Sequence, residues 1–135
     1  MTGFPSITEP AIAALVTRFY GKARVDPIIG PVFEEAVEDW DEHLAKLCDF
    51  WSSVMLTTGR YKGNPMMAHV KQTKIAPDFF DRWLALWHET AGEIFAPAPA
   101  AQFNLKAERI AESLKLAMFY RPGNFPIARG PSTPA

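Results

Sequence analysis

Hydrophobic residues recur at steps of three and four along most of the chain, which is the spacing of one face of an α-helix. The first such run begins near residues 6–9, where S-x-x-E has the form of a capping box, or at Thr8 acting as the cap. Pro10 falls in the first turn, where a missing N–H does least harm. The helix is predicted to end near Asp26-Pro27, because a residue before proline disfavours helical geometry. Its apolar face comprises Ile12, Leu15, Val16, Phe19, Tyr20 and Ala23.

The same periodicity predicts four further helices. A short piece opens at Gly30-Pro31, and the next helix is expected to stop at Gly59. The last helix is expected to begin only after Pro97 and Pro99 break the chain. The predicted ranges are 30–37, 39–58, 77–95 and 101–120.

Two segments lack a strong helical pattern. Residues 63–74 are interpreted as a loop with at most a turn or two of helix around residues 66–70. After Arg121 the chain is rich in Pro and Gly without periodicity, so residues 122–135 are predicted to be a disordered tail on a domain of residues 1–121. No segment has a strand pattern, and the predicted class is all-α.

Composition narrows the function classes. The 135 residues fit one domain, 48% hydrophobic and 13% aromatic, so the aromatic side chains either overfill a small core or line a pocket. A net charge of −1 gives no electrostatic case for nucleic acid or an anionic membrane surface. Cys48 is the single cysteine, which excludes an internal disulfide. Without an apolar run of about 18 residues or a leader pattern, the chain is expected to be soluble and cytoplasmic.

Common enzyme motifs are missing, and the candidate chemistry consists of polar residues beside large apolar ones. Tyr20, His43 and Trp83 occupy predicted apolar helix faces, and His69 lies in the weak segment. Each has an ordinary interpretation: a core histidine bonded to a carbonyl, a tyrosine at the edge of the core, a tryptophan filling it, and a solvated loop histidine. His88 is interpreted as a surface residue.

Taken together, these residues favour a non-peptide ligand. A bound group would account for the aromatic excess and for the short segment around His69, since an isolated helical turn is marginal in water. The neighbourhood of His69 offers no four-ligand zinc site. One histidine in apolar surroundings is how a haem iron is held on its proximal side.

The chain resembles the truncated haemoglobins, and within them the third group. The resemblance covers roughly residues 7–120. Glycine pairs at the helix junctions, which are usual in the other two groups, are missing from this sequence. Four stretches carry it in order: FYGKARVDPIIGPVF (19–33), WDEHLAKLCDFW (40–51), RYKGNPMMAHV (60–70) and FFDRWLALW (79–87).

The resemblance implies a shortened globin, with two pairs of helices stacked over one haem b. In that arrangement His69 is the proximal iron ligand, although Lys71, Gln72 and Thr73 stand where the family often has leucine and proline. The implied distal residues are Tyr20, His43 and Trp83. The resemblance also implies that Phe33 packs on the porphyrin, that Lys46 pairs with a propionate, and that the haem wall includes Leu47, Phe50, Trp51, Leu86 and Met118.

Three functions stay open at this point. The first is a five-coordinate haem protein that binds dioxygen, nitric oxide, carbon monoxide or peroxide, with nitric oxide dioxygenase or peroxidase activity supported by a reductase. The second is a haem-based sensor or carrier that acts through a protein partner, with the tail as a contact. The third is a metal-free helical module whose aromatic face meets a protein or lipid. Colour on purification separates the third from the first two, and steady turnover separates the first from the second.

Overall fold

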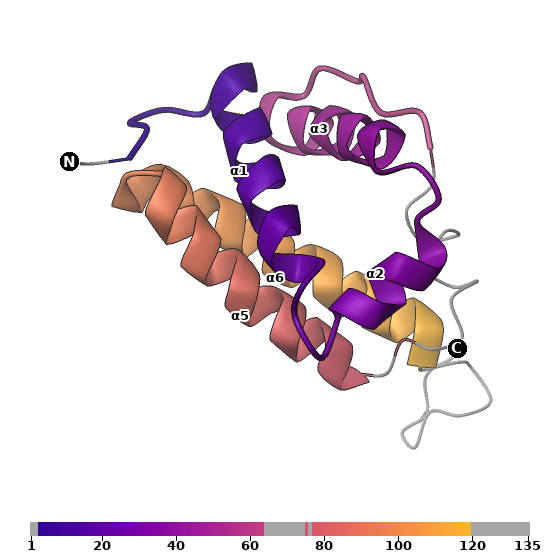
Figure 1. Ribbon diagram of the computed structural model, residues 1–135. Helices are drawn as coiled ribbons and strands as arrows, with labels where there is room; N and C mark the ends of the chain where they lie inside the picture. Colours follow the sequence, from indigo (N-terminus) through magenta and orange to yellow (C-terminus); the bar gives the residue numbers. More distant parts are fainter. Residues whose placement is uncertain (1–2, 64–74, 76, 120–135) are drawn as a thin grey trace, which may run out of the picture.

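The chain is helical in the computed structural model, which describes residues 3–63, 75 and 77–119 (Figure 1). This confirms the predicted all-α class, with one isolated β-bridge between Phe4 and Phe95 in the described residues. The helices are α1 (Glu9–Ala23), α2 (Gly30–Ala36), α3 (Trp40–Leu56), α5 (Pro77–Ile94) and α6 (Pro97–Phe119).

Helix α1 begins at the second of the two predicted caps. The backbone N–H of Ala11 donates to Thr8 Oγ1 over 3.3 Å, and Glu9 places a negative charge in the first turn. Every predicted apolar position of α1 is buried, Tyr20 among them with 4% of its surface exposed. The helix ends at Ala23, three residues before the predicted Asp26-Pro27 boundary.

A tight corner turns the chain from α1 into α2. The N–H of Gly30 donates to the carbonyl of Asp26 over 2.9 Å. A Cβ at Gly30 would lie 2.7 Å from the carbonyl oxygen of Arg24, so the close approach of the two helices requires glycine. This corner brings Phe33 of α2 against Tyr20 of α1, with ring centroids 5.4 Å apart.

Helix α3 is shorter than predicted at its C-terminal end. Asp39 caps the start by accepting from the N–H of Glu42 over 3.1 Å. The helix stops at Leu56 rather than Thr58, because Thr57 takes the left-handed conformation with φ of 55°. The next hydroxyl, Thr58 Oγ1, lies 2.8 Å from Ser52 Oγ, which holds the chain back against the helix it has just left.

Helix α6 begins at Pro97, so the prediction that Pro97 and Pro99 break the chain before a helix starting at Ala101 was wrong. Both prolines lie in the first turn, where an amide hydrogen would have no helical partner. The first helical hydrogen bond runs from the N–H of Ala100 to the carbonyl of Ala96 over 3.1 Å.

The helices form two pairs. Helices α5 and α6 run antiparallel, and α1 packs against both α5 and α3 (Figure 1). Phe33 of α2 contacts Phe79 near the start of α5. None of the helices in the described part of the chain combines the length and the apolar character that a membrane-spanning helix needs. The largest fully buried apolar side chains are Trp51, Trp87, Phe19, Phe103, Ile12, Leu15, Ile29 and Val16.

Candidate functional site

The inward face of α3 is less covered than its sequence predicts. Trp51 and Ser52 are its buried residues, whereas Trp40, Leu44 and Leu47 of the predicted stripe are half-buried. Among the described residues, this face borders two cavities instead of a continuous core. An apolar helix face beside open space indicates a site for a ligand.

An inner cavity of about 290 Å³ lies between α1, α3, α5 and α6. Its wall is mainly aromatic and aliphatic, and its polar atoms come from few side chains, as is usual for small-molecule sites. Eight residues that the sequence analysis selected line it: Tyr20, Phe33, His43, Lys46, Leu47, Phe50, Trp51 and Trp83.

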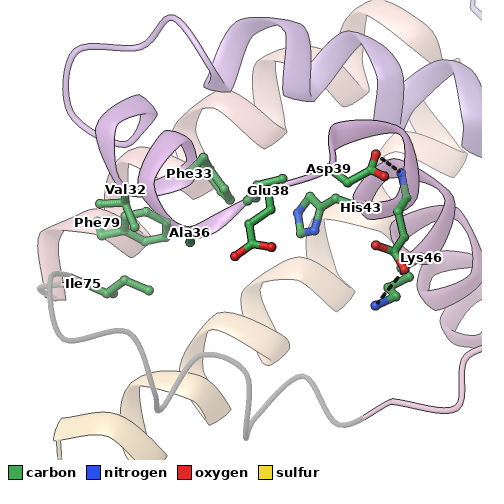
Figure 2. A pocket seen from close by; sticks show the side chains of 11 residues that line it. Val32, Phe33, Ala36, Glu38, Asp39, His43, Lys46, Ile75 and Phe79 are labelled. Atoms are coloured by element: carbon green, nitrogen blue, oxygen red, sulfur yellow. Dashed lines mark hydrogen bonds and ion pairs between the residues drawn. The ribbon is translucent and has the colours of Figure 1, made fainter.

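An outer cavity of about 350 Å³ continues the inner one toward the start of α3 (Figure 2). One side is apolar and includes Val32 and Ile75, and the other carries Glu38, Asp39 and Glu42. The two cavities share Phe33, His43, Lys46 and Phe79, so they form one crevice that is apolar inside and charged at its rim. We refer to both cavities together as the crevice.

Tyr20 presents a hydroxyl that stays protonated. Burial raises the pKa of its phenol far above the usual range, and the opposing effect of a hydrogen bond from the Trp83 indole is smaller. The single N–H of the Trp83 indole is used on the Tyr20 oxygen, so the Tyr20 O–H is the donor of this pair that can face a ligand in the inner cavity.

His43 lies at the junction of the two cavities, with its Nε2 atom shielded from solvent. Its imidazole packs edge-to-face against Tyr20, with centroids 5.8 Å apart and planes at 89°. The Trp40 ring meets it in the same way at 5.5 Å and 88°. His43 is thus fixed between two aromatic rings beside the Tyr20 hydroxyl.

Phe33 and Lys46 occupy the rim side of the crevice. The Phe33 ring lies 5.8 Å from that of Phe79 on α5, so these two rings form an aromatic edge to the crevice. Lys46 is exposed, and its Nζ is 3.8 Å from the carboxylate of Glu42 one turn earlier. A flexible ammonium at the rim of an apolar slot can reach an anionic group of a bound ligand.

Two of the predicted site residues in the described part of the chain, Leu86 and Met118, line neither cavity. Leu86 is buried in the core and Met118 packs half-buried against it. Their role as haem wall stays a prediction. His69 lies outside the described residues, so its role as iron ligand also stays a prediction.

Six residues that were not predicted from the sequence to belong to the site also line the inner cavity. Some, such as Phe79 and Ile110, were placed on apolar faces, but periodicity does not distinguish a face on the core from a face on a cavity. Tyr61 gave no signal, because it is held by a tertiary bond from its N–H to Ser53 Oγ over 2.9 Å. The six are Tyr61, Phe79, Phe80, Ile110, Ala111 and Leu114.

The crevice fits a flat apolar group with an anionic edge, such as a porphyrin. Its interior is aromatic and its rim offers the Lys46 ammonium, while hydrogen-bond donors gather on one wall. The searched residues hold no group of three or more His, Cys, Asp or Glu side chains placed to bind a metal ion directly.

Two pairs of helices enclosing such a crevice define a truncated globin. No family model matches the sequence. The group 3 truncated hemoglobin ctb of Campylobacter jejuni subsp. jejuni is 32% identical over 124 residues, which cover 89% of this chain and 97% of that protein. The crystal structure of a group III truncated hemoglobin from Campylobacter jejuni matches with a TM-score of 0.83 at 30% identity, over 87% of this chain and 96% of that one. The chain belongs to the group III truncated haemoglobins.

Proposed function

We propose that the protein binds haem b in the crevice and, through it, dioxygen and other diatomic ligands. The apolar interior and membership of the truncated haemoglobins support this proposal. Phe33 and the inner wall formed by Leu47, Phe50 and Trp51 would pack on the porphyrin, and Lys46 would pair with a propionate. His69, in the segment outside the described residues, would be the proximal ligand.

The Tyr20 hydroxyl on the wall of the inner cavity carries the proposal. The Tyr20 hydroxyl keeps its proton because burial raises its pKa, and the Trp83 indole is a donor only. When bound, ferrous haem supplies the electron density that makes dioxygen a partly charged acceptor. A hydrogen bond to a charged acceptor contributes about 1.5–3 kcal/mol, which slows dissociation roughly ten- to a hundredfold. Slow release suits retention or turnover of dioxygen better than its transport.

The Tyr20→Phe variant tests this role. Its dioxygen dissociation rate should rise roughly ten- to a hundredfold, because one donor is lost. Carbon monoxide carries less charge, so its dissociation should change little. Both rates are measured by stopped-flow ligand replacement. The matched control is Tyr61→Phe, which removes a hydroxyl from the same cavity and should leave both rates unchanged. Equal effects of Tyr20→Phe on the two gases would contradict the assignment.

Within this class we propose nitric oxide dioxygenation as the reaction, with peroxide reduction as the alternative. Retained dioxygen and a cavity that continues past His43 into a second compartment would let nitric oxide meet dioxygen and leave as nitrate. A reductase would return the electron that each turnover removes. Steady consumption of nitric oxide in the presence of a reductant supports the enzyme. Intact ligand binding without turnover of nitric oxide or peroxide would favour a sensor or carrier instead.

A further inference from the structure

The Trp40 indole packs beside the site, nearest to His43 and also close to the Tyr20 and Phe33 rings, at centroid distances of 6.1 and 6.2 Å. It is the first residue of α3, and its ring meets the His43 imidazole edge-to-face at 5.5 Å. Trp40 lines neither the inner nor the outer cavity, so it does not face a ligand in the crevice. The imidazole is the nearest of these three rings, so we expect an effect of Trp40 on ligands to act mainly through His43.

A cation covers the same indole. The guanidinium carbon of Arg24 lies 4.3 Å from the Trp40 ring centroid, in cation–π contact. Arg24 Nε in turn donates to Glu34 Oε2 over 3.3 Å. Because Arg24 caps the end of α1, Glu34 belongs to α2 and Trp40 starts α3, this stack joins three helices beside His43.

We propose that Arg24 and Trp40 are positioning residues that hold the His43 imidazole at the junction of the two cavities and so set the rate at which gas ligands reach the inner cavity. The proposal rests on the function proposed above. A ring packed edge-to-face on two sides, by Tyr20 and Trp40, cannot rotate away without losing one contact. His43 is one of the side chains that border both cavities, so its orientation changes how open the passage between them is.

The expected change in the rate of ligand access follows from the strength of the cation–π contact between Arg24 and Trp40. A cation–π contact of a partly exposed arginine changes the ratio of two side-chain orientations by about two- to fivefold. Removing the cation should free the imidazole and speed ligand access by a similar factor. Removing the indole should do at least as much, since the packing contact is lost as well.

The test is carbon monoxide rebinding after flash photolysis of the haem-loaded full chain. Arg24→Gln should raise the association rate about two- to fivefold. Arg24→Lys keeps a cation and should stay near wild type. Arg18→Gln is the matched control, because Arg18 is an exposed arginine of α1 that pairs with Glu93 on α5 over 2.8 Å; it should have no effect. Arg24 is exposed, so the test stands even if Trp40→Leu does not fold.

Double variants distinguish an effect on the position of the His43 imidazole from a general loss of packing in the protein. Arg24→Gln should have no further effect in a His43→Ala background, and should add nothing to Trp40→Leu. In the diamagnetic ferrous carbonyl form, the His43 ring protons should shift by NMR in Arg24→Gln and stay in place in Arg18→Gln.

Two failures can be told apart. A loaded chain whose association rate and His43 resonances are unchanged in Arg24→Gln overturns the positioning role. So does an effect of equal size in the His43→Ala background. A chain that shows no Soret band with haemin overturns the proposed function itself and the role in ligand access with it.

Discussion

Asp26 carries a buried carboxylate that fastens the corner between α1 and α2 to α5. Its Oδ2 atom accepts from the N–H groups of Ile28 and Ile29, both over 3.0 Å. Its Oδ1 atom accepts from Arg82 through Nε at 2.8 Å and Nη2 at 2.7 Å. Burial alone would raise the pKa of this carboxyl, but the hydrogen bonds and the guanidinium outweigh it and lower the pKa. Arg82 directly precedes Trp83, so the ion pair between Asp26 and Arg82 also helps to hold Trp83 at the inner cavity.

Replacing Asp26 with asparagine should lower the free energy of unfolding by about 1–3 kcal/mol near neutral pH. The folded pKa lies below the ordinary aspartate value of about 3.9, so the contribution is fully present above that value. It is lost as the pH falls through the folded pKa. Urea unfolding of wild type and Asp26→Asn from about pH 7 to about pH 2 should therefore show a difference that shrinks in acid. The exposed neighbour of Arg82 provides the control, Asp81→Asn, which should change stability by less than about 0.5 kcal/mol. A difference independent of pH would contradict the assignment.

For single residues, the sequence identifies the polar side chains of the site better than it identifies which residues they contact in the fold. Tyr20, His43 and Trp83 could be selected because each is polar on an apolar face, and the structure brings all three to the inner cavity. The partner of Asp26 could not be predicted, since Arg82 follows 56 residues later and no local pattern pairs them. Asp26-Pro27 indicated only that a helix ends nearby.

Helix boundaries depend on contacts that periodicity does not contain. A proline suits the first turn of a helix as well as a break before one, so Pro97 and Pro99 were ambiguous. The early end of α3 is marked by the left-handed Thr57 and by the hydrogen bond between Ser52 and Thr58 that follows it. Likewise, Leu47 lines the inner cavity while Leu86 is buried in the core, although the resemblance implied that both belong to the haem wall.

The N-terminal cap of α1 gives a prediction for a single element. Thr8→Ala removes the acceptor for the N–H of Ala11 and should lower the free energy of unfolding by about 1 kcal/mol. Thr17→Ala is the control, because Thr17 is exposed in the middle of the same helix and alanine is the better helix former there. Urea unfolding should show a loss for Thr8→Ala and none for Thr17→Ala. Equal losses would show that the cap is not the cause.

At the scale of the whole molecule, a stack of three tryptophans joins the core to the crevice. The Trp87 ring stacks on Trp51 at 4.6 Å and 20°, and on Trp83 at 5.4 Å and 12°. Trp87 is fully buried, whereas Trp51 and Trp83 also line the inner cavity. The aromatic side chains therefore both fill the core and wall the pocket, which were the two roles that composition left open. This packing holds Trp83, and with it one side of the inner cavity, against the close-packed core.

The order and class of the helices follow from periodicity, but their arrangement in space does not. Apolar faces on separate helices indicate that the helices pack together, without specifying which face meets which. An arrangement of two pairs of helices was expected only through the resemblance to truncated haemoglobins, which did not specify which helices pair. That resemblance also connects the crevice with His69, for which periodicity gives no role.

The central claim is that this crevice holds haem with His69 on its proximal side. The most direct measurement is the absorption spectrum of the haemin-reconstituted protein beside His69→Ala and a matched variant, His88→Ala. His88 is exposed and pairs with Glu108 over 3.0 Å, so its loss should leave the spectrum unchanged. Wild type should show a Soret band with distinct ferrous, oxy and carbonyl forms, and His69→Ala should weaken or alter them. Absence of a Soret band in wild type, or spectra that His69→Ala leaves intact, would contradict the account.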